Sequence, residues 1–269
     1  MKHHLITGAA SGFGFGLART LLARGDSVMA CDVNAAPMEQ LRAFATAPAQ
    51  LNIRQLDVRD AAQWEQTMQA ASHLWPRIDT VMNVAGVLRP DFIADIKLAD
   101  IDLTFDVNTK GAILGAQAAF RAMRNQADEN GRGHIINISS MAGIAPVPGI
   151  SIYTASKFAL RGYSLAIAHE LKQYAISITV VCPSGADTPL VEPYKHKEKA
   201  ALIFSLPLLT TDQVVRAIVD RALVKRPMEM ALPRPRGLLA KLAASFPAAA
   251  TLLAGSMTRK GLYNQAKMK

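Results

Sequence analysis

The chain has 269 residues, half of them hydrophobic, and carries a formal net charge of +9. This length and composition suit one large α/β domain with a sizeable core. Its two cysteines, Cys31 and Cys182, lie in apolar strand-like runs, which indicates buried free thiols rather than a disulfide, and no Cys-x-x-Cys or His-x-x-x-His spacing indicates a metal site.

Strand-like and helical segments alternate along the chain. Apolar runs end near Thr7, Asp32, Leu56, Asn83, Ser139, Cys182 and Leu232, and helical periodicity fills residues 14–24, 36–46, 60–75, 98–127, 152–174 and 211–224. This alternation predicts a doubly wound parallel sheet, an α/β fold with helices on both faces and ligands at the carboxyl ends of the strands. The first strand begins at once and leaves no room for a signal peptide, so we expect a cytoplasmic protein.

A glycine-rich turn follows the first strand. It reads Thr7-Gly8-Ala9-Ala10-Ser11-Gly12-Phe13-Gly14 and precedes an amphipathic helical run. Glycines in this context let the backbone approach a pyrophosphate, and the helix amino end favours its negative charge. Taken alone, the turn also fits an unrelated α/β protein. We expect a dinucleotide to contact Gly8, Ser11, Gly12, Phe13 and Gly14.

Residues 140–157 carry a second pattern, in which Ser140 precedes Tyr153 by thirteen positions and Lys157 follows it by four. Tyr153 and Lys157 would share one face of a helix. Because an ammonium beside a phenol favours the phenolate, we expect the pKa of Tyr153 to fall below its usual ~10. Tyr153 is therefore a candidate general acid/base, and the Ser140 hydroxyl a candidate partner for a substrate oxygen.

These two motifs together resemble those of the short-chain dehydrogenase/reductase family, and the resemblance extends over residues 2 to about 232. Further family segments follow in order: Asp57-Val58, Asn83-Val84-Ala85-Gly86, Val107-Asn108 with Gly111, and Pro183-Ser184-Gly185-Ala186-Asp187-Thr188. Val84 stands where the family has a second asparagine. Ser184 stands where it has a glycine, which puts the backbone contact to nicotinamide in question.

The resemblance implies a Rossmann fold and hydride transfer between a nicotinamide and a substrate carbon. Tyr153 would exchange the hydroxyl proton and Ser140 would bind the same oxygen. Lys157 would lower the pKa of Tyr153 and bind the nicotinamide ribose, while Asn108 would hold a water that relays the proton. Further cofactor contacts are implied for Asp57, Val58, Asn83, Ala85, Gly86, Pro183, Gly185 and Thr188.

Asp32 points to the choice of cofactor. It ends the second strand eighteen positions after Gly14, where a carboxylate accepts hydrogen bonds from a ribose 2′-OH and repels a 2′-phosphate. Neither Ser11 nor Val33, where NADP-using family members often carry a basic residue, is basic. Asp32 also fits a helix cap or a turn. We expect NAD, with NADP the less favoured alternative.

Two segments are implied to wall the substrate site. Residues 141–150 carry no charge, and residues 190–204 include apolar residues on both sides of a charged run. They favour a lipophilic secondary alcohol or ketone, such as a steroid-, retinoid-, fatty- or aromatic-alcohol-like compound. The same residues would also pack a lid without specifying the substrate.

Residues 225–269 depart from the family and carry nine basic residues against one acid, Glu229, a net charge of +8. Seventeen uncharged residues separate Lys241 from Arg259 and include Leu252 and Leu253. Pro247 interrupts them, which argues against a membrane-spanning helix. An anionic membrane surface fits this pattern, as does a helix packed over the substrate site or a subunit contact. Nucleic acid fits poorly because aromatic residues are few.

The sequence therefore predicts a catalytic domain at residues 1–232 and a basic, apolar extension at residues 233–269. An NAD-dependent alcohol dehydrogenase or ketone reductase is favoured, because a non-catalytic dinucleotide sensor or scaffold needs no positioned acid/base, and the chain is short for a dehydratase or epimerase relative. We expect a homodimer or homotetramer paired through residues 98–127 and 152–174. The small residues there are Ala112, Ala116, Ala119, Ala155, Ala159 and Ala166.

Overall fold

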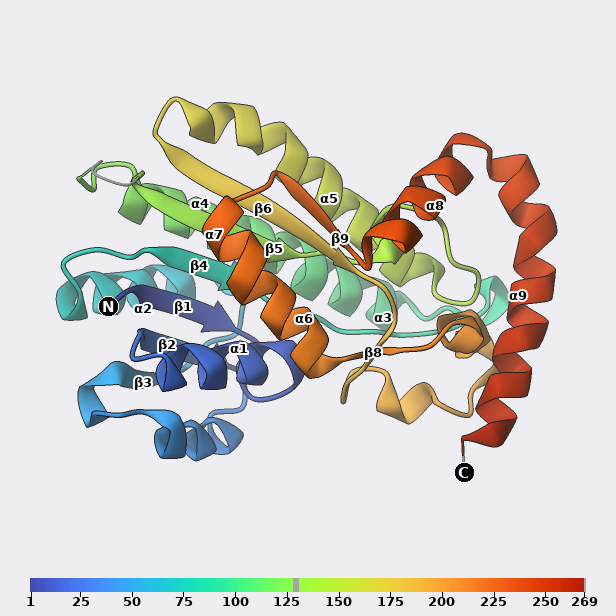
Figure 1. Cartoon of the computed structure of the whole chain (residues 1–269), viewed down its shortest axis with the longest axis horizontal. Helices are drawn as coiled ribbons and strands as arrows, with labels where there is room; N and C mark the ends of the chain where they lie inside the picture. The colour runs from blue at the N-terminus through green and yellow to red at the C-terminus, as the bar shows by residue number, and fades with distance from the viewer. Residues whose placement is uncertain (128–130, 269) are drawn as a thin grey trace.

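The computed structural model describes residues 1–127 and 131–268, without the side chains of residues 249–253. Its centre is a parallel sheet in the order β3-β2-β1-β4-β5-β6-β9 (Figure 1). The strands are β1 His3–Thr7, β2 Ser27–Asp32, β3 Leu51–Gln55, β4 Thr80–Asn83, β5 Gly133–Ile138, β6 Ile176–Pro183 and β9 Glu229–Leu232. The order reverses beside β1, where a doubly wound sheet opens a ligand crevice. The predicted α/β fold is confirmed.

The helices cover both faces of this sheet and, at the C-terminus of the chain, the carboxyl end of its strands (Figure 1). They are α1 Gly12–Ala23, α2 Ala61–Leu74, α3 Leu98–Phe105, α4 Ala112–Met123, α5 Ser151–Lys172, α6 Thr211–Ala217, α7 Leu223–Lys225, α8 Arg234–Ser245 and α9 Pro247–Lys267. Short 3₁₀ helices are η1 Ala36–Phe44, η2 Pro48–Gln50, η3 Ile93–Asp95, η5 Met141–Gly143, η6 Glu192–Tyr194 and η7 Glu198–Ser205. A small second sheet pairs β7 Ala186–Asp187 with β8 Leu209–Thr210.

Several predicted helices differ in detail. The segment at 36–46 is 3₁₀ rather than α-helical. The segment at 98–127 ends at Met123 and is interrupted by a π-helical turn, η4 Asp106–Gly111, and a second π turn, η8 Ile218–Ala222, separates α6 from α7. A π turn inserts an extra residue into the helical repeat and so shifts the face that the following residues present. The one at η4 contains Asn108.

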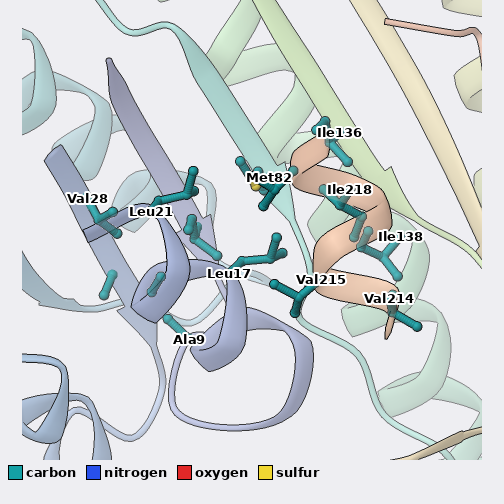
Figure 2. Close-up of a cluster of buried hydrophobic side chains, with 14 of the residues drawn as sticks. Ala9, Leu17, Leu21, Val28, Met82, Ile136, Ile138, Val214, Val215 and Ile218 are labelled. Carbon is teal, nitrogen blue, oxygen red and sulfur yellow. The ribbon is translucent and has the colours of Figure 1, made fainter. Parts of the chain in front are cut away.

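The sheet strands send alternate side chains to opposite faces, as their pleat requires. In β1, Ile6 packs with α1 and α6, and Leu5 packs with α2 and α4. Figure 2 shows the first of these clusters, in which Leu17 of α1 lies beside Val215 of α6 and Leu21 lies farther along α1. Burial on both faces explains why the strands read as continuous apolar runs.

The prediction that the small residues of α4 face another subunit is wrong. Ala112, Ala116 and Ala119 are buried within their own chain, where they pack against the sheet side of the fold. Small residues in α4 therefore permit close approach to the sheet, not to another subunit. On α5, Ala155, Ala159 and Ala166 are exposed.

The C-terminal helices pack on the body of the protein. A Cβ at Gly261 would overlap the Ala201 carbonyl, so α9 lies directly against η7. Asn264 Nδ2 donates to the Phe204 carbonyl at 2.8 Å, and Gln265 Nε2 donates to the Lys197 carbonyl at 3.0 Å. On α8, Lys241 Nζ lies 3.2 Å from the Glu229 carboxylate. Within residues 1–127 and 131–268, no helix has the length and apolarity needed to cross a bilayer.

Candidate active site

A cavity of about 1140 Å³ lies at the carboxyl ends of the central strands. Its walls include the turn after β1, the ends of β2, β4, β5 and β6, and residues of η7, α8 and α9. The sequence-predicted site residues that line it are Gly8, Ser11, Gly12, Phe13, Gly14, Asp32, Asp57, Val58, Ala85, Gly86, Ser140, Tyr153, Lys157, Pro183, Gly185 and Thr188. Asn83 and Asn108 lie behind this wall.

The glycine turn is shaped by close backbone packing. Gly8 has φ +67°, and a Cβ there would come within 2.8 Å of the Ala85 amide nitrogen. A Cβ at Gly14 would overlap the Gly8 carbonyl. The turn therefore closes tightly enough to bring the amino end of α1 to the cavity.

That amino end suits an anion. Ser11, the N-cap of α1, makes no side-chain capping bond, and the first turn contains no acidic residue. Free backbone N–H groups at a helix amino end attract a phosphate. A Cβ placed on Gly12 would lie 3.8 Å from Thr188 Cβ. The turn and Thr188 therefore lie against each other at the edge of the cavity, and the free N–H groups at the amino end of α1 are the part of this wall that suits a pyrophosphate.

Asn83 is used inside the protein. Its Nδ2 donates to Asn137 Oδ1 at 2.8 Å and to the Ala112 carbonyl at 3.3 Å, and the residue is 4% exposed. The structure therefore does not bring this predicted contact residue to the cavity. Its amide instead joins β4 to β5 and α4, and the neighbouring Ala85 and Gly86 line the cavity.

The two acidic residues at the far end of the cavity are both tied to nearby groups. Asp32 Oδ2 accepts a hydrogen bond from the Ala10 amide at 3.1 Å, and Oδ1 accepts one from Asn34 at 3.0 Å. It therefore serves as a turn residue while still lining the cavity. Asp57 forms an ion pair with Arg59, and hydrogen bonding from that guanidinium lowers the pKa of the carboxyl.

Ser140, Tyr153 and Lys157 come together where β5 ends and α5 begins. Burial raises the pKa of Tyr153 to about 12, and a hydrogen bond with Ser140 acts in the opposite direction. The expected fall in the pKa of Tyr153 is therefore wrong for this structure. Desolvation disfavours the phenolate more than the nearby groups favour it.

Lys157 approaches Tyr153 but bonds elsewhere. Its Nζ lies 5.6 Å from the Tyr153 ring centroid and donates to the Ile138 carbonyl at 2.9 Å. Burial lowers the pKa of Lys157 to about 8, which weakens the positive charge it presents near neutral pH.

Ser139 and Ser140 have separate positions. Ser139 Oγ donates to the Lys157 carbonyl at 2.9 Å and is buried, so it fastens α5 to β5. Ser140 Oγ accepts a hydrogen bond from the Ala142 amide at 3.1 Å and lines the cavity. Ser140 is the one that faces Tyr153.

Asn108 lies behind Lys157 in the π turn and is 1% exposed. Its Nδ2 donates to the Val87 carbonyl and to Ser156 Oγ, and its Oδ1 accepts from the Val87 amide at 2.8 Å. A Cβ on Gly86 would lie 3.2 Å from Asn108 Oδ1 and 3.5 Å from Lys157 Nζ, so both residues approach the same point. Both Nδ2 protons are used, so the side chain has only the second lone pair of Oδ1 left to offer to a water.

The substrate end of the cavity is mainly apolar. It includes the predicted segments through Met141, Ala142, Ala145, Pro146, Val147, Pro148, Ile150, Leu190, Val191, Leu202 and Ile203. The tail adds Arg236, Leu239, Ala240, Leu242, Ala243, Phe246, Ala254 and Met257, which sequence reasoning did not assign individually. A helix of the tail therefore packs over this end of the cavity, as one of the alternatives for the tail predicted, and the contact with an anionic membrane surface stays a prediction.

Arg236 was counted only as part of the basic tail, and no local pattern singles it out. Its Nη1 donates to Ser184 Oγ at 3.1 Å and to the Pro207 carbonyl at 2.9 Å. Ser184 is the residue that replaces the family glycine. The departure from the family pattern thus has a partner inside this chain, because the Ser184 hydroxyl connects the 183–188 segment to α8.

Comparisons with known proteins agree with this geometry. The family model for short chain dehydrogenase matches residues 2–199. A 3-alpha-(or 20-beta)-hydroxysteroid dehydrogenase of Mycobacterium tuberculosis is 33% identical over 192 residues, covering 71% of each protein. A 3-oxoacyl-(acyl-carrier-protein) reductase of Thermotoga maritima is 31% identical over 205 residues, covering 76% of this chain and 82% of that protein.

Among solved structures, levodione reductase superposes with a TM-score of 0.78 at 24% identity, covering 88% of this chain and 98% of that one. This likeness concerns the fold. The family match covers most of the chain and ends at residue 199, within η7, so it does not include the C-terminal helices α8 and α9. The chain is thus an oxidoreductase that belongs to the short-chain dehydrogenase family.

Proposed function

We propose that the protein is an NAD-dependent alcohol dehydrogenase or ketone reductase acting on a lipophilic secondary alcohol or ketone. The observation that carries the proposal is the position of Ser140, Tyr153 and Lys157, which line one cavity between the glycine turn and an apolar wall. Bound nicotinamide would supply the hydride acceptor or donor.

The chain's own residues would handle the proton. Tyr153 would give a proton to the carbonyl oxygen during reduction and take it back during oxidation, while Ser140 orients that oxygen. With a pKa raised to about 12, the Tyr153 phenol stays protonated near neutral pH and is ready to act as an acid. Lys157 would exchange the proton with a water held by Asn108, because the two side chains approach the same point beside Gly86.

The preference for NAD rests on Asp32. Its carboxylate lines the cavity beside the glycine turn, where a 2′-phosphate would meet a negative charge. Gly12 and Thr188 would hold the pyrophosphate, and Lys157 the nicotinamide ribose. Val58 would lie against the adenine, with the Asp57–Arg59 pair beside it.

The lipophilic substrate class rests on the cavity wall. Residues 141–150 add no charged group, and the wall from α8 and α9 contributes leucine, alanine, phenylalanine and methionine side chains around a single cation, Arg236, in the part of the chain that the structure describes. Such a wall gains free energy by removing apolar substrate surface from water, at ~25 cal/mol per Å².

Assembly and location are further parts of the proposal. A homodimer through α5 is supported by the exposed small residues Ala155, Ala159 and Ala166, which lie beside Phe158, itself 37% exposed. A cytoplasmic location is supported by Cys31 and Cys182, which are both free and buried.

The direct test is a panel of secondary alcohols, from short water-soluble ones to bulky steroid-like ones, offered with NAD or NADP while NADH or NADPH absorbance is followed. Turnover with NAD that improves with apolar bulk is expected. Equal efficiency with NADP would contradict the cofactor assignment. Binding of NAD without turnover of any alcohol, or of any ketone with NADH, would favour a dinucleotide sensor.

A further inference from the structure

The outer side of α8 carries exposed apolar side chains at the mouth of the cavity. Leu238, Leu239, Leu242 and Phe246 are 64%, 65%, 50% and 66% exposed, and we call them the α8 apolar strip. Their spacing of three and four residues places them along one side of the helix. Leu239, Leu242 and Phe246 also line the cavity. The same apolar surface therefore continues from inside the cavity to the outside of the protein.

Basic residues flank this strip. Arg234 and Lys241 lie on the adjoining side of α8, because each is three or four positions from Leu238. Arg259 and Lys260 are also exposed, but they lie farther away, on α9 about 20 Å of helix beyond the corner at Phe246. Within the described part of the chain, Arg234, Arg259 and Lys260 form no salt bridge, whereas Lys241 reaches Glu229. On α8 itself the charged residues are Arg234, Arg236 and Lys241, all basic, so the helix that carries the strip bears positive charge and no acidic residue.

The place of the strip in the fold also matters. α8 and α9 meet at a corner that stands clear of the sheet, at the right of the view in Figure 1. Phe246 forms this corner, immediately before Pro247. An apolar edge with cations beside it is the arrangement that binds a bilayer interface, where leucines and phenylalanines enter the acyl boundary and cations meet anionic headgroups.

We propose that the α8 apolar strip docks on an anionic lipid surface, and that substrate passes between that surface and the cavity along the strip. Docking stands on the exposed strip and its charge. The passage of substrate rests on the proposed dehydrogenase function. A water-soluble substrate would need no apolar path at the cavity mouth, whereas a lipophilic one would remain in contact with apolar surface from the membrane to the active site.

Leu238 is the residue that tests docking with least disturbance, because it is exposed and does not line the cavity. Its matched control is Leu74→Ser, which removes the same side chain from an exposed position at the end of α2, next to Trp75, whose ring packs on His3 at the amino end of β1 and so on the side of the sheet away from the cavity. For charge, Arg234→Gln is matched by Arg216→Gln on α6, which is also exposed and forms no ion pair in the described chain.

The full chain should co-sediment with vesicles containing phosphatidylglycerol and not with pure phosphatidylcholine vesicles. Added salt of about 0.5 M should release it, because charge screening weakens the headgroup contacts. Leu238→Ser should weaken binding by about tenfold and Arg234→Gln by about fivefold. Leu74→Ser and Arg216→Gln should match the parent. Absence of sedimentation with anionic vesicles, or equal loss in the control variants, would overturn docking.

A second copy of the chain is the competing occupant of the strip. If Leu238→Ser lowers the mass measured by light scattering and leaves vesicle binding unchanged, the strip is a subunit contact and the lipid proposal is wrong. Light scattering of the parent and of Leu238→Ser at the same concentration separates these outcomes.

Measurements of enzyme activity provide an independent test of the passage of substrate along the strip. Leu238→Ser should keep parental activity on a short soluble alcohol and lose several-fold activity on a long-chain alcohol supplied in anionic vesicles. Equal activity on both substrates would overturn the passage of substrate along the strip. Vesicle binding without oxidation of any alcohol would contradict the proposed function and leave the docking proposal intact. Oxidation of alcohols without vesicle binding would contradict the docking proposal and leave the proposed function intact.

Discussion

The two sides of the cavity differ in how the segment that forms the wall is held in place. On the cofactor side, the turn from Gly8 to Gly14 is a single short segment whose shape depends in part on a contact within it, because a Cβ on Gly14 would overlap the Gly8 carbonyl. On the substrate side, α9 packs on η7 through Gly261 and Ala201, sixty positions apart. The glycine turn can therefore be recognised from a local pattern, whereas the position of α9 depends on distant segments that must first fold together.

Tyr153→Phe acts where the two sides meet and should have the largest effect. The ring and its packing remain while the exchangeable proton is lost, so turnover should fall ~10²–10⁴-fold with cofactor affinity nearly unchanged. Steady-state kinetics and NADH-binding fluorescence measure the two quantities. A variant that keeps more than about a tenth of the parental rate would remove Tyr153 from its acid/base role.

Gly14→Ala should weaken the binding of the cofactor without changing the substrate wall. The added methyl group overlaps the Gly8 carbonyl, so the turn must open. We expect NAD affinity to fall by at least about tenfold and the protein to lose about 2 kcal/mol of stability. The control is Gly162→Ala on α5, where nothing lies within 4 Å of the added methyl group and helix propensity makes the change neutral or stabilising. Equal NAD titrations for both variants would contradict the turn assignment.

The pH dependence should separate the two directions of the reaction. Oxidation needs the Tyr153 phenolate, and with the pKa raised to about 12 the phenolate fraction rises about tenfold for each pH unit below that value. Oxidation should therefore accelerate from about pH 7 to about pH 9, while ketone reduction, which needs the protonated phenol, should change little. Oxidation that is flat over this range would mean that the phenol is already ionised in the working enzyme.

Gly261→Ala should weaken the binding of the substrate without changing that of the cofactor. The methyl group overlaps the Ala201 carbonyl and pushes α9 off η7, which should raise KM for bulky alcohols by about fivefold and leave NAD affinity intact. Gly255→Ala on the same helix meets nothing within 4 Å and should behave as the parent. If both variants keep parental KM values, α9 plays no part in substrate binding.

Asp32→Ser should reduce the preference for NAD over NADP, and this is the smallest of the expected effects. Removing the carboxylate ends its repulsion of a 2′-phosphate, so NADP efficiency should rise by about fivefold, an effect of about 1 kcal/mol. Asp32→Asn, which keeps an oxygen acceptor for the Ala10 amide, controls for the loss of that hydrogen bond. The ratio of NAD to NADP efficiency is the measurement, and an unchanged ratio in both variants would leave Asp32 a turn residue only.

The sequence was sufficient for the sheet and for most of the cavity wall because those follow from local rules. Apolar runs that alternate with helical periodicity predict parallel strands, and the ends of such strands converge at one edge. The inward side chain of Asn83 was not predictable in this way. A residue at a strand end can turn toward the cavity or toward the next helix, and only the positions of Asn137 and Ala112 decide which.

Two other errors have physical causes of a different kind. Ala112 and its neighbours in α4 were assigned to a subunit contact from their size, but small residues also let a helix approach its own sheet. The pKa of Tyr153 depends on desolvation as well as on nearby charge, and the extent of burial is a property of the folded chain. For the tail, the composition shows that it is basic and apolar but does not show which face of α9 packs on η7.

In terms of chain entropy, the two helices of the tail form one segment that is fixed to the body of the protein near both of its ends. Lys241 with Glu229, and Arg236 with Ser184, fix α8, while Gly261, Asn264 and Gln265 fix α9. A segment closed at two points has already lost most of the conformational entropy of its ends, and the remaining entropy varies only slowly with its length. Changes in the length of the α8–α9 corner should therefore be tolerated by the fold and should leave Ser140 and Tyr153 in place.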